Sequence, residues 1–244
     1  MPGIGKEFFL KTRYHFLGSS EQDRGVPQPP LELEAGKDAA ELALPPASSL
    51  VIPRQDLREA IERRRSLRRY ARAPLTLEEL SFLLWCTQGV RKVVTGSATF
   101  RTVPSAGARH AIETYLLVNN VQGVPEGLYR YSALRHALLE LKREPGLADQ
   151  LTAACLGQEF VKSSAVTFAW TAVVQRMRWR YGERGYRYLL LDAGHVCQNL
   201  YLAAEAVACG VCAIAAFDDE AADRLLDLDG EEQFSLYLAT VGKK

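Results

Sequence analysis

Two stretches in the first half of the chain repeat their hydrophobic positions at helical spacing. Residues 54–65 predict a short helix and residues 74–90 a longer one. Thr76 and Glu79 have the spacing of a capping box, in which each side chain caps a free backbone N–H of the first turn, and Gly89 ends this second helix. The apolar positions are Leu57, Ala60 and Ile61 in the first helix and Leu77, Leu80, Leu83 and Leu84 in the second.

The second half of the chain mixes strand and helix patterns. The helix predicted at residues 185–210 has apolar residues on most sides, so it should be buried. Helices and antiparallel strands are mixed without strict βαβ repetition, which predicts an α+β fold. We expect strands at residues 112–120, 165–174, 211–217 and 231–242, a hairpin of two antiparallel strands at 127–141, and further helices at 146–157 and 218–228.

Residues 17–54 form a distinct region. They hold six of the eleven prolines and have little apolar periodicity. This composition predicts an extended arm or a linker that crosses a surface. We therefore divide the chain into an extended N-terminal arm, residues 1–54, and one domain, residues 55–244.

The composition is that of a soluble globular protein. Of the 244 residues, 48% are hydrophobic and 24% are charged, with a net charge of +1. A dedicated nucleic-acid binder usually carries a broad basic excess, so we expect no nucleic-acid partner. No apolar run reaches the ~18 residues that span a bilayer, and the N-terminus lacks the apolar core of a signal peptide. We expect a cytoplasmic protein with no membrane partner.

The cysteines raise the question of a metal site. Cys209 and Cys212 have C-x-x-C spacing, and His195 and Cys197 precede them, as in the zinc site of nucleobase deaminases. That site needs a glutamate two residues after its first ligand, where this chain has Cys197. Cys197 and Cys209 also fall on the predicted apolar helix, where a free cysteine is usually a small core residue. We predict no metal site.

An arginine-rich stretch, "IERRRSLRRYAR" at residues 61–72, stands out in a nearly neutral chain. It holds six arginines and one glutamate. A solvated helix end would usually interleave glutamate or lysine. Arginine is preferred where an oxyanion is bound by two parallel hydrogen bonds, and the Ser66 hydroxyl can add another. From this stretch alone, phosphate binding and a solvated face remain equally open.

Two further stretches are candidate functional segments. In "RTVPSAGARHAIETYLLV", small residues just before a strand let the backbone approach something flat or bulky, although an ordinary turn would have the same composition. In "RWRYGERGYRYLLLDAGHVCQNL", polar residues cluster just before and within the long helix. No Walker loop, G-x-G-x-x-G or G-x-S-x-G is present, which removes the main support for P-loop, dinucleotide-fold and serine hydrolase interpretations.

Together and in this order, the three stretches resemble the nitroreductase superfamily of FMN proteins, and more narrowly its SagB-type dehydrogenase branch. The likeness covers roughly residues 55–244, so it implies an FMN-binding domain there. It also implies an antiparallel central sheet flanked by helices and an intertwined homodimer with FMN at the subunit interface. By this resemblance the FMN contacts are Arg64, Arg65, Ser66 and Arg68 at the phosphate and ribityl chain, Pro104, Ser105, Ala106 and Gly107 at the isoalloxazine, and the backbone amides of Ala215 and Ala216 near the reactive N5.

The chain departs from the SagB-type pattern at two points. A Lys-Tyr pair is implicated in removing a proton from the azoline ring in azole-forming members, and the matching residues here are Arg180 and Tyr181. Arginine stays protonated at neutral pH, so it cannot be the base, whereas Tyr181 can donate a hydrogen bond or proton. Ala216 stands where the family commonly has glycine.

The resemblance implies an FMN-dependent oxidoreductase that transfers a hydride through flavin N5 to or from a small or peptide-derived substrate. The alternatives are an azoline (thiazoline or oxazoline) dehydrogenase of a peptide-modification cluster and a non-catalytic flavin-binding protein. NAD(P)H is a candidate reductant, but no nucleotide-specific motif selects NADH or NADPH.

Overall fold

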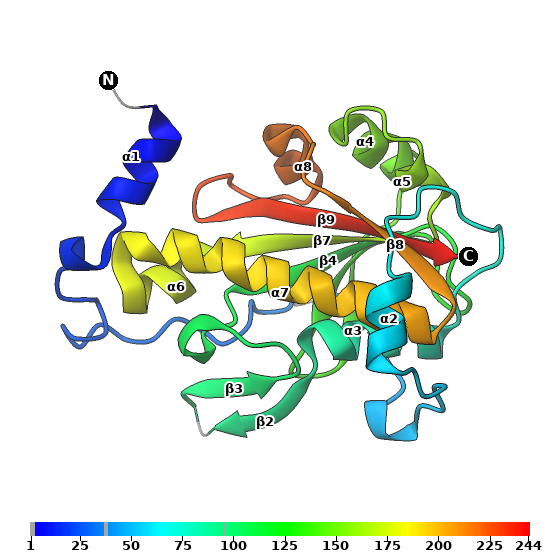
Figure 1. Cartoon of the computed structure of the whole chain (residues 1–244), viewed down its shortest axis with the longest axis horizontal. Helices are drawn as coiled ribbons and strands as arrows, with labels where there is room; N and C mark the ends of the chain where they lie inside the picture. The colour runs from blue at the N-terminus through cyan, green and yellow to red at the C-terminus, as the bar shows by residue number, and fades with distance from the viewer. Residues whose placement is uncertain (1–2, 37–38, 95) are drawn as a thin grey trace.

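The computed structural model describes residues 3–36, 39–94 and 96–244, and its centre is a seven-stranded sheet (Figure 1). The strand order is β1-β6-β5-β4-β7-β9-β8, and every neighbouring pair is antiparallel. A separate two-stranded ribbon pairs β2 (Val90–Val94) with β3 (Ala98–Arg101). The strands of the main sheet are β1 (Glu41–Ala43), β4 (Ile112–Val118), β5 (Gly127–Ser132), β6 (Ala137–Lys142), β7 (Val166–Val173), β8 (Cys209–Ile214) and β9 (Gln233–Lys243).

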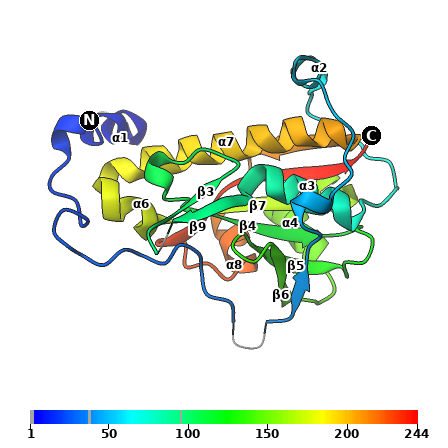
Figure 2. The same cartoon turned by 90° about the horizontal axis from the view of Figure 1, so that it is seen from below.

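Helices cover both faces of this sheet (Figure 2). Within β4, Leu116 packs with one apolar cluster and Leu117 with another, because successive side chains of a strand point to opposite faces. The first cluster includes residues of α3 and α7, and the second includes residues of α4 and α8. The helices are α1 (Ile4–Lys11), α2 (Leu57–Arg63), α3 (Leu77–Gln88), α4 (Leu147–Ala154), α5 (Phe160–Ser163), α6 (Val174–Tyr181), α7 (Gly185–Ala206) and α8 (Asp219–Leu225).

The expected α+β class and the expected strands and helices of the second half are confirmed, with shifts of a few residues at their ends. The capping box of α3 is also confirmed: Thr76 N donates to Glu79 Oε2 at 2.9 Å, and Glu79 N donates to Thr76 Oγ1 at 3.2 Å. The predicted stripe of α2 is not a core stripe, since Leu57 and Ile61 are 63% and 54% exposed. Only Ala60 of that stripe is buried.

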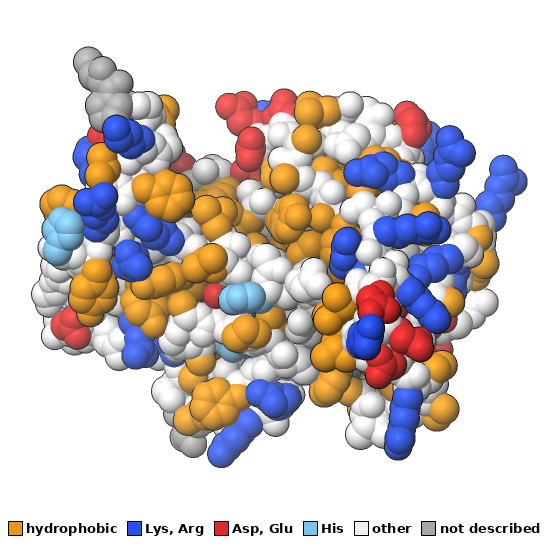
Figure 3. Space-filling model, in the orientation of Figure 1, with side chains coloured by type: hydrophobic (Ala, Val, Ile, Leu, Met, Phe, Trp, Pro, Cys, Tyr) orange, Lys and Arg blue, Asp and Glu red, His pale blue; other side chains and the backbone are white. Residues whose placement is uncertain are grey.

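The long helix α7 is less buried than its composition predicts. Leu190 and Leu191 are 56% and 59% exposed, so one side of the helix has no cover within the described chain. Figure 3 shows hydrophobic side chains gathered across the middle of this face of the molecule. A second correction concerns Cys209, which begins strand β8 and does not lie on the helix. None of the helices among the described residues is long and apolar enough to cross a membrane.

The proline-rich segment, residues 17–54, contains only short elements of regular structure among its described residues, and it is bound to the domain. Helix α1 precedes it and was not expected from the sequence. Strand β1 joins the edge of the main sheet beside β6. Two hydrogen bonds attach the part of the chain between α1 and β1. Arg176 Nε donates to Pro30 O at 2.8 Å, and Leu33 N donates to Glu113 Oε1 at 3.2 Å. Arg176 and Glu113 themselves form an ion pair of 2.6 Å, with side chains 3% and 5% exposed.

Candidate functional site

The arginine-rich stretch meets the second half of α7 through a tyrosine. The Ser66 hydroxyl lies 3.0 Å from the Tyr201 hydroxyl, which accepts a hydrogen bond of 2.9 Å from Ala213 N at the end of β8. The guanidinium carbon of Arg64 lies 5.2 Å from the centre of the Tyr201 ring. This is cation–π geometry, so the ring holds Arg64 beside Ser66 without neutralising its charge.

The backbone after Arg64 is fixed against β8. Leu67 N donates to Val211 O at 2.9 Å, and Ser66 forms an isolated parallel bridge with Val211. A Cβ atom on Gly210 would lie 2.3 Å from the Leu67 side chain, so only glycine allows this close approach. Arg65 and Arg68 are exposed on this passage, and neither forms an ion pair within the described part of the chain.

Ala215 and Ala216 come directly after the end of β8 and are exposed. Ala213, two residues earlier, is the donor to Tyr201. Strand β8 thus leads directly into the predicted N5 segment. Through Tyr201, Ala213 of the same strand is connected to Ser66 in the predicted phosphate-binding stretch.

The segment Pro104–Gly107 meets the first half of α7 through a buried carboxylate. The Ser105 hydroxyl donates to Asp192 Oδ2 at 2.5 Å, and Ala106 N donates to Asp192 Oδ1 at 3.3 Å. His110 N in turn donates to the Ser105 hydroxyl at 2.9 Å. Burial raises the pKa of Asp192, and the two hydrogen bonds from Ser105 and Ala106 oppose that shift because they favour the charged form. Asp192 therefore positions this segment.

Gly107 brings this segment against the predicted catalytic pair. Its φ of 58° is in the left-handed region that favours glycine. A Cβ atom there would lie 2.4 Å from the Tyr181 hydroxyl and 3.1 Å from Cδ and Nε of Arg180. Gly107 and the Arg180–Tyr181 pair, which come from two different motifs, are thus neighbours, while Pro104 at the start of the segment is exposed.

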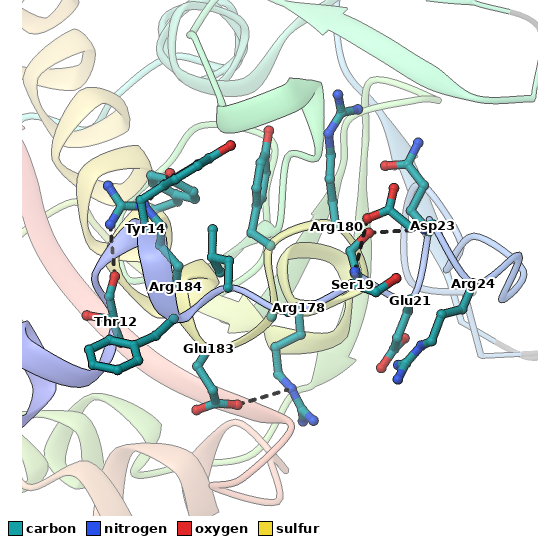
Figure 4. Close-up of a pocket in the computed structure, with 18 of the residues that line it drawn as sticks. Thr12, Tyr14, Ser19, Glu21, Asp23, Arg24, Arg178, Arg180, Glu183 and Arg184 are labelled. Carbon is teal, nitrogen blue, oxygen red and sulfur yellow. Dashed lines mark hydrogen bonds and ion pairs between the residues drawn. The ribbon is translucent and has the colours of Figure 1, made fainter.

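Arg180 and Tyr181 also line a cleft of about 710 Å³ (Figure 4). One wall is the end of α6 and the turn that follows it, and the other is the N-terminal arm. Gln22 N donates to Trp179 O at 2.9 Å, and Trp179 Nε1 donates to Val26 O at 2.8 Å, so the arm is tied directly to α6.

The two groups of predicted residues do not meet within one chain. The first group contacts Tyr201 and the second contacts Asp192, nine positions earlier on α7. At about 100° per residue this is close to half a turn, and at about 1.5 Å per residue it is roughly 14 Å along the axis. The groups therefore lie at opposite sides of the same helix.

Sequence reasoning missed three contributors to this region. Asp192 had a signal, because a carboxylate stands inside an otherwise apolar helix. Tyr201 had none, since a tyrosine on that helix is an ordinary core residue. The arm residues 18–24 had none either, because their place beside Tyr181 depends on how the chain folds back.

Comparison with known proteins places these features in a family. Residues 61–243 match the Nitroreductase family. The Methanocaldococcus jannaschii protein MJ1384, which is named as a nitroreductase, is 35% identical over 85% of this chain and 98% of its own length. The trifolitoxin-processing protein TfxB of Rhizobium leguminosarum bv. trifolii is 34% identical over 49% of this chain and 33% of its own length.

Solved structures agree with these matches. A Ralstonia eutropha protein described as a nitroreductase has a TM-score of 0.69 and 26% identity, and the match covers 86% of this chain and 91% of that one. A chain of the Escherichia coli microcin synthetase McbBCD complex has a TM-score of 0.62 over 99% of this chain and 92% of its own. At 20% identity, the second likeness is one of fold.

Proposed function

Because the chain belongs to the nitroreductase family, and is thus an oxidoreductase of that family, we propose that it is an FMN-dependent enzyme of the SagB-type branch. It would transfer a hydride through flavin N5 to or from a small or peptide-derived substrate. The observation that carries this proposal is the juxtaposition of Ser66 with three arginines that have no ion-pair partner among the described residues: Arg64, Arg65 and Arg68.

This donor set fits a phosphate. Guanidinium groups offer planar pairs of N–H donors that match phosphate oxygens, and the Ser66 hydroxyl adds a donor beside them. Arg63, one residue before the set, is already paired with Glu59. Arg64 is fixed over Tyr201, so less side-chain freedom would be lost when it binds the ligand.

The second group fits the flavin ring. Gly107 lets Tyr181 and Arg180 approach its backbone closely, and Asp192 holds the backbone of Ser105 and Ala106 in place. When bound, FMN supplies the hydride chemistry. The backbone amides of Ala215 and Ala216 would stabilise negative charge on the reduced ring, and Tyr181 would donate a hydrogen bond or a proton to the substrate.

We expect the purified protein to be yellow, to release FMN on denaturation, and to lose affinity for FMN when Arg64 is replaced by alanine. A charge-assisted hydrogen bond to phosphate contributes roughly 1.5–3 kcal/mol, so the dissociation constant should rise about ten- to a hundredfold. The dissociation constant is measured from flavin fluorescence as FMN is titrated into the FMN-free protein.

Arg72→Ala is the matched control. Arg72 lies at the end of the same arginine-rich stretch. Its backbone carbonyl accepts a hydrogen bond from Asn120, and among the described residues its side chain forms no ion pair. Its replacement should hardly change FMN affinity. Equal losses from the two variants would remove Arg64 from the proposed phosphate site, and a colourless protein that fails to bind added FMN would refute the proposed function.

The position of the two groups on α7 supports a homodimer. Since they lie at opposite sides of the helix, a second copy that packs along α7 would bring the arginine group of one chain toward the Gly107 segment of the other. The exposed leucines Leu190 and Leu191 give that packing an apolar surface.

We expect light scattering at micromolar concentration to give about twice the 27.1 kDa of one chain. Leu191→Glu should shift the protein toward the monomer, because it places a charge in the proposed interface. Leu156→Glu is the control, since Leu156 is 65% exposed but follows α4 on the other side of the sheet. A monomeric wild type would contradict the dimer.

The nature of the substrate is supported by the relatives. TfxB is named as a trifolitoxin-processing protein, and the microcin synthetase complex was solved with truncated pro-MccB17 bound. A peptide-derived substrate is therefore part of the proposal. An azoline dehydrogenase is a weaker candidate, because Arg180 cannot take up the proton that a neutral lysine could.

A further inference from the structure

The cleft beside Tyr181 has an unusual distribution of paired and unpaired charges. Arg178 Nη1 donates to Glu232 Oε1 at 3.1 Å. Arg184 donates to the Tyr188 hydroxyl at 2.7 Å and to Thr12 O at 2.8 Å. The guanidinium groups of Arg178 and Arg184 thus already have hydrogen-bond acceptors within the protein.

Arg180 has no such acceptor. Across the described residues, no ion pair or hydrogen bond engages its guanidinium, which lies 5.7 Å from the centre of the Tyr181 ring. The side chain is exposed and lines the cleft. In Figure 4 it points away from Arg178 and Arg184, and Asp23 of the arm lies to one side of it.

A second positive charge lies close to Arg180. Arg109 donates to Gly107 O at 3.1 Å and packs 5.3 Å above the Trp179 ring. Burial lowers the pKa of Arg109, and the nearby charge of Arg180 lowers it further. Arg109 is buried and is not among the residues that line the cleft, but two nearby guanidinium groups together produce a potential that attracts an anion to the exposed one, Arg180.

Asp23, an acidic residue of the arm that lines the same cleft, is already hydrogen-bonded within its own turn. Asp23 Oδ2 accepts a hydrogen bond of 3.0 Å from Ser20 N, and Asp23 N donates to the Ser20 hydroxyl at 3.1 Å. These bonds lower the pKa of Asp23, with a smaller contribution from Arg180. Asp23 thus partly offsets the positive potential but does not form an ion pair with Arg180.

We propose that this arm-walled cleft is an oxyanion subsite, in which Arg180 binds a carboxylate or phosphate of the molecule that reacts at the flavin. The proposal rests on the proposed function and deepens it by naming a substrate class. Cδ and Nε of Arg180 lie 3.1 Å from the place that a Cβ atom on Gly107 would occupy. A molecule whose anionic group is bound by Arg180 would therefore lie beside the proposed flavin site. The arm, tied to α6 through Gln22 and Val26, would be the opposite wall.

The test uses two acceptors of nearly equal size, 4-nitrobenzoate and 4-nitrobenzamide, with the FMN-loaded protein. The wild type should prefer the charged acceptor in kcat/KM. Arg180→Met should lower that preference about tenfold, mostly through KM, because a charge-assisted hydrogen bond is lost. Arg178→Met, the same change two residues away, should leave the preference unaltered. Asp23→Asn should increase it, since a competing negative charge is removed while the turn acceptor remains.

Two further measurements identify the source of the anion and separate the two proposals. Comparison of NADPH with NADH in the reduction step shows whether the 2′-phosphate of the reductant is the group bound by Arg180. Calorimetric titration with both nitro compounds reports binding even without turnover. The subsite would be overturned if Arg180→Met left the preference for the anion unchanged in all three measurements: acceptor turnover, reduction by NADPH against NADH, and calorimetric titration. Flavin that neither acceptor reoxidises would instead count against the proposed function.

Discussion

Glu113→Gln is expected to lower the free energy of unfolding by about 3–5 kcal/mol, because it leaves a buried guanidinium without its counter-charge. The Glu113 carboxylate pairs with Arg176 at 2.6 Å, and both side chains are almost fully buried. It also acts on a second buried arginine: burial lowers the pKa of Arg101, and the charge of Glu113 is the main influence that raises it again. Glutamine has the same shape but no charge, so both arginines lose the stabilisation.

The same change should loosen the N-terminal arm. Glu113 Oε1 accepts the hydrogen bond from Leu33 N, and the Arg176 that it orients donates to Pro30 O. Limited proteolysis should therefore cut the arm of the variant sooner than that of the wild type. Urea denaturation at one fixed protein concentration measures the loss of stability, since the unfolding midpoint of the proposed dimer would depend on protein concentration.

Two further variants make this expectation specific. Glu62 pairs with Arg58 on the surface, with side chains 60% and 85% exposed, so Glu62→Gln should change stability by less than about 1 kcal/mol. The double variant Glu113→Leu, Arg176→Met should recover part of the loss, because an apolar pair leaves less uncompensated charge. If Glu113→Gln were no worse than Glu62→Gln, the ion pair would not be what holds the arm.

Six of the seven strands of the main sheet could be predicted because they are buried on both faces or alternate clearly, whereas β1 lies in the segment that was predicted to be an extended arm. Residues 115–118 form a continuous apolar run, and both faces of that strand are covered in the structure. Strands β2 and β3 were missed because their burial is irregular: the middle of β2 is exposed. Helix α1 was missed because it contributes no buried residue, so its apolar side chains follow no core pattern.

The candidate site could be predicted only in pieces. Each motif has a local signal, such as the arginines around Ser66 or the small residues around Gly107. Their relative placement depends on contacts between positions far apart in the chain, such as Ser105 with Asp192, which α7 brings together. The arm beside Tyr181 has no local signal at all, because main-chain atoms, whose hydrogen bonds any sequence can make, provide much of its attachment.

Gly107→Ala is expected to slow reoxidation of the reduced flavin by 4-nitrobenzamide about a hundredfold, which is the order of loss that a displacement of about 1 Å can cause in an active site. The new Cβ atom would lie 2.4 Å from the Tyr181 hydroxyl, far inside contact distance, so the tyrosine must move. Alanine at a φ of 58° also costs roughly 1–2 kcal/mol of stability. Stopped-flow absorbance of the flavin measures the rate, and thermal unfolding measures the stability.

Gly123→Ala separates these two effects. Gly123 has a φ of 75°, and a Cβ atom there would meet nothing within 4 Å. The control thus has the backbone cost without the collision, and its reoxidation rate should equal that of the wild type. If Gly123→Ala and Gly107→Ala slowed the flavin equally, lost stability would explain both and the contact with Tyr181 would be irrelevant.

The double variant Gly107→Ala, Tyr181→Phe then tests what Tyr181 does. Phenylalanine lacks the hydroxyl that the new methyl group meets, so the collision is relieved while the proposed donor is lost. If Gly107→Ala acts by displacing that hydroxyl, the double variant should react no more slowly than Tyr181→Phe alone, because one function cannot be removed twice. Losses that multiply would instead mean that Gly107 contributes separately, through its backbone against the flavin ring, and that Tyr181 is only its neighbour.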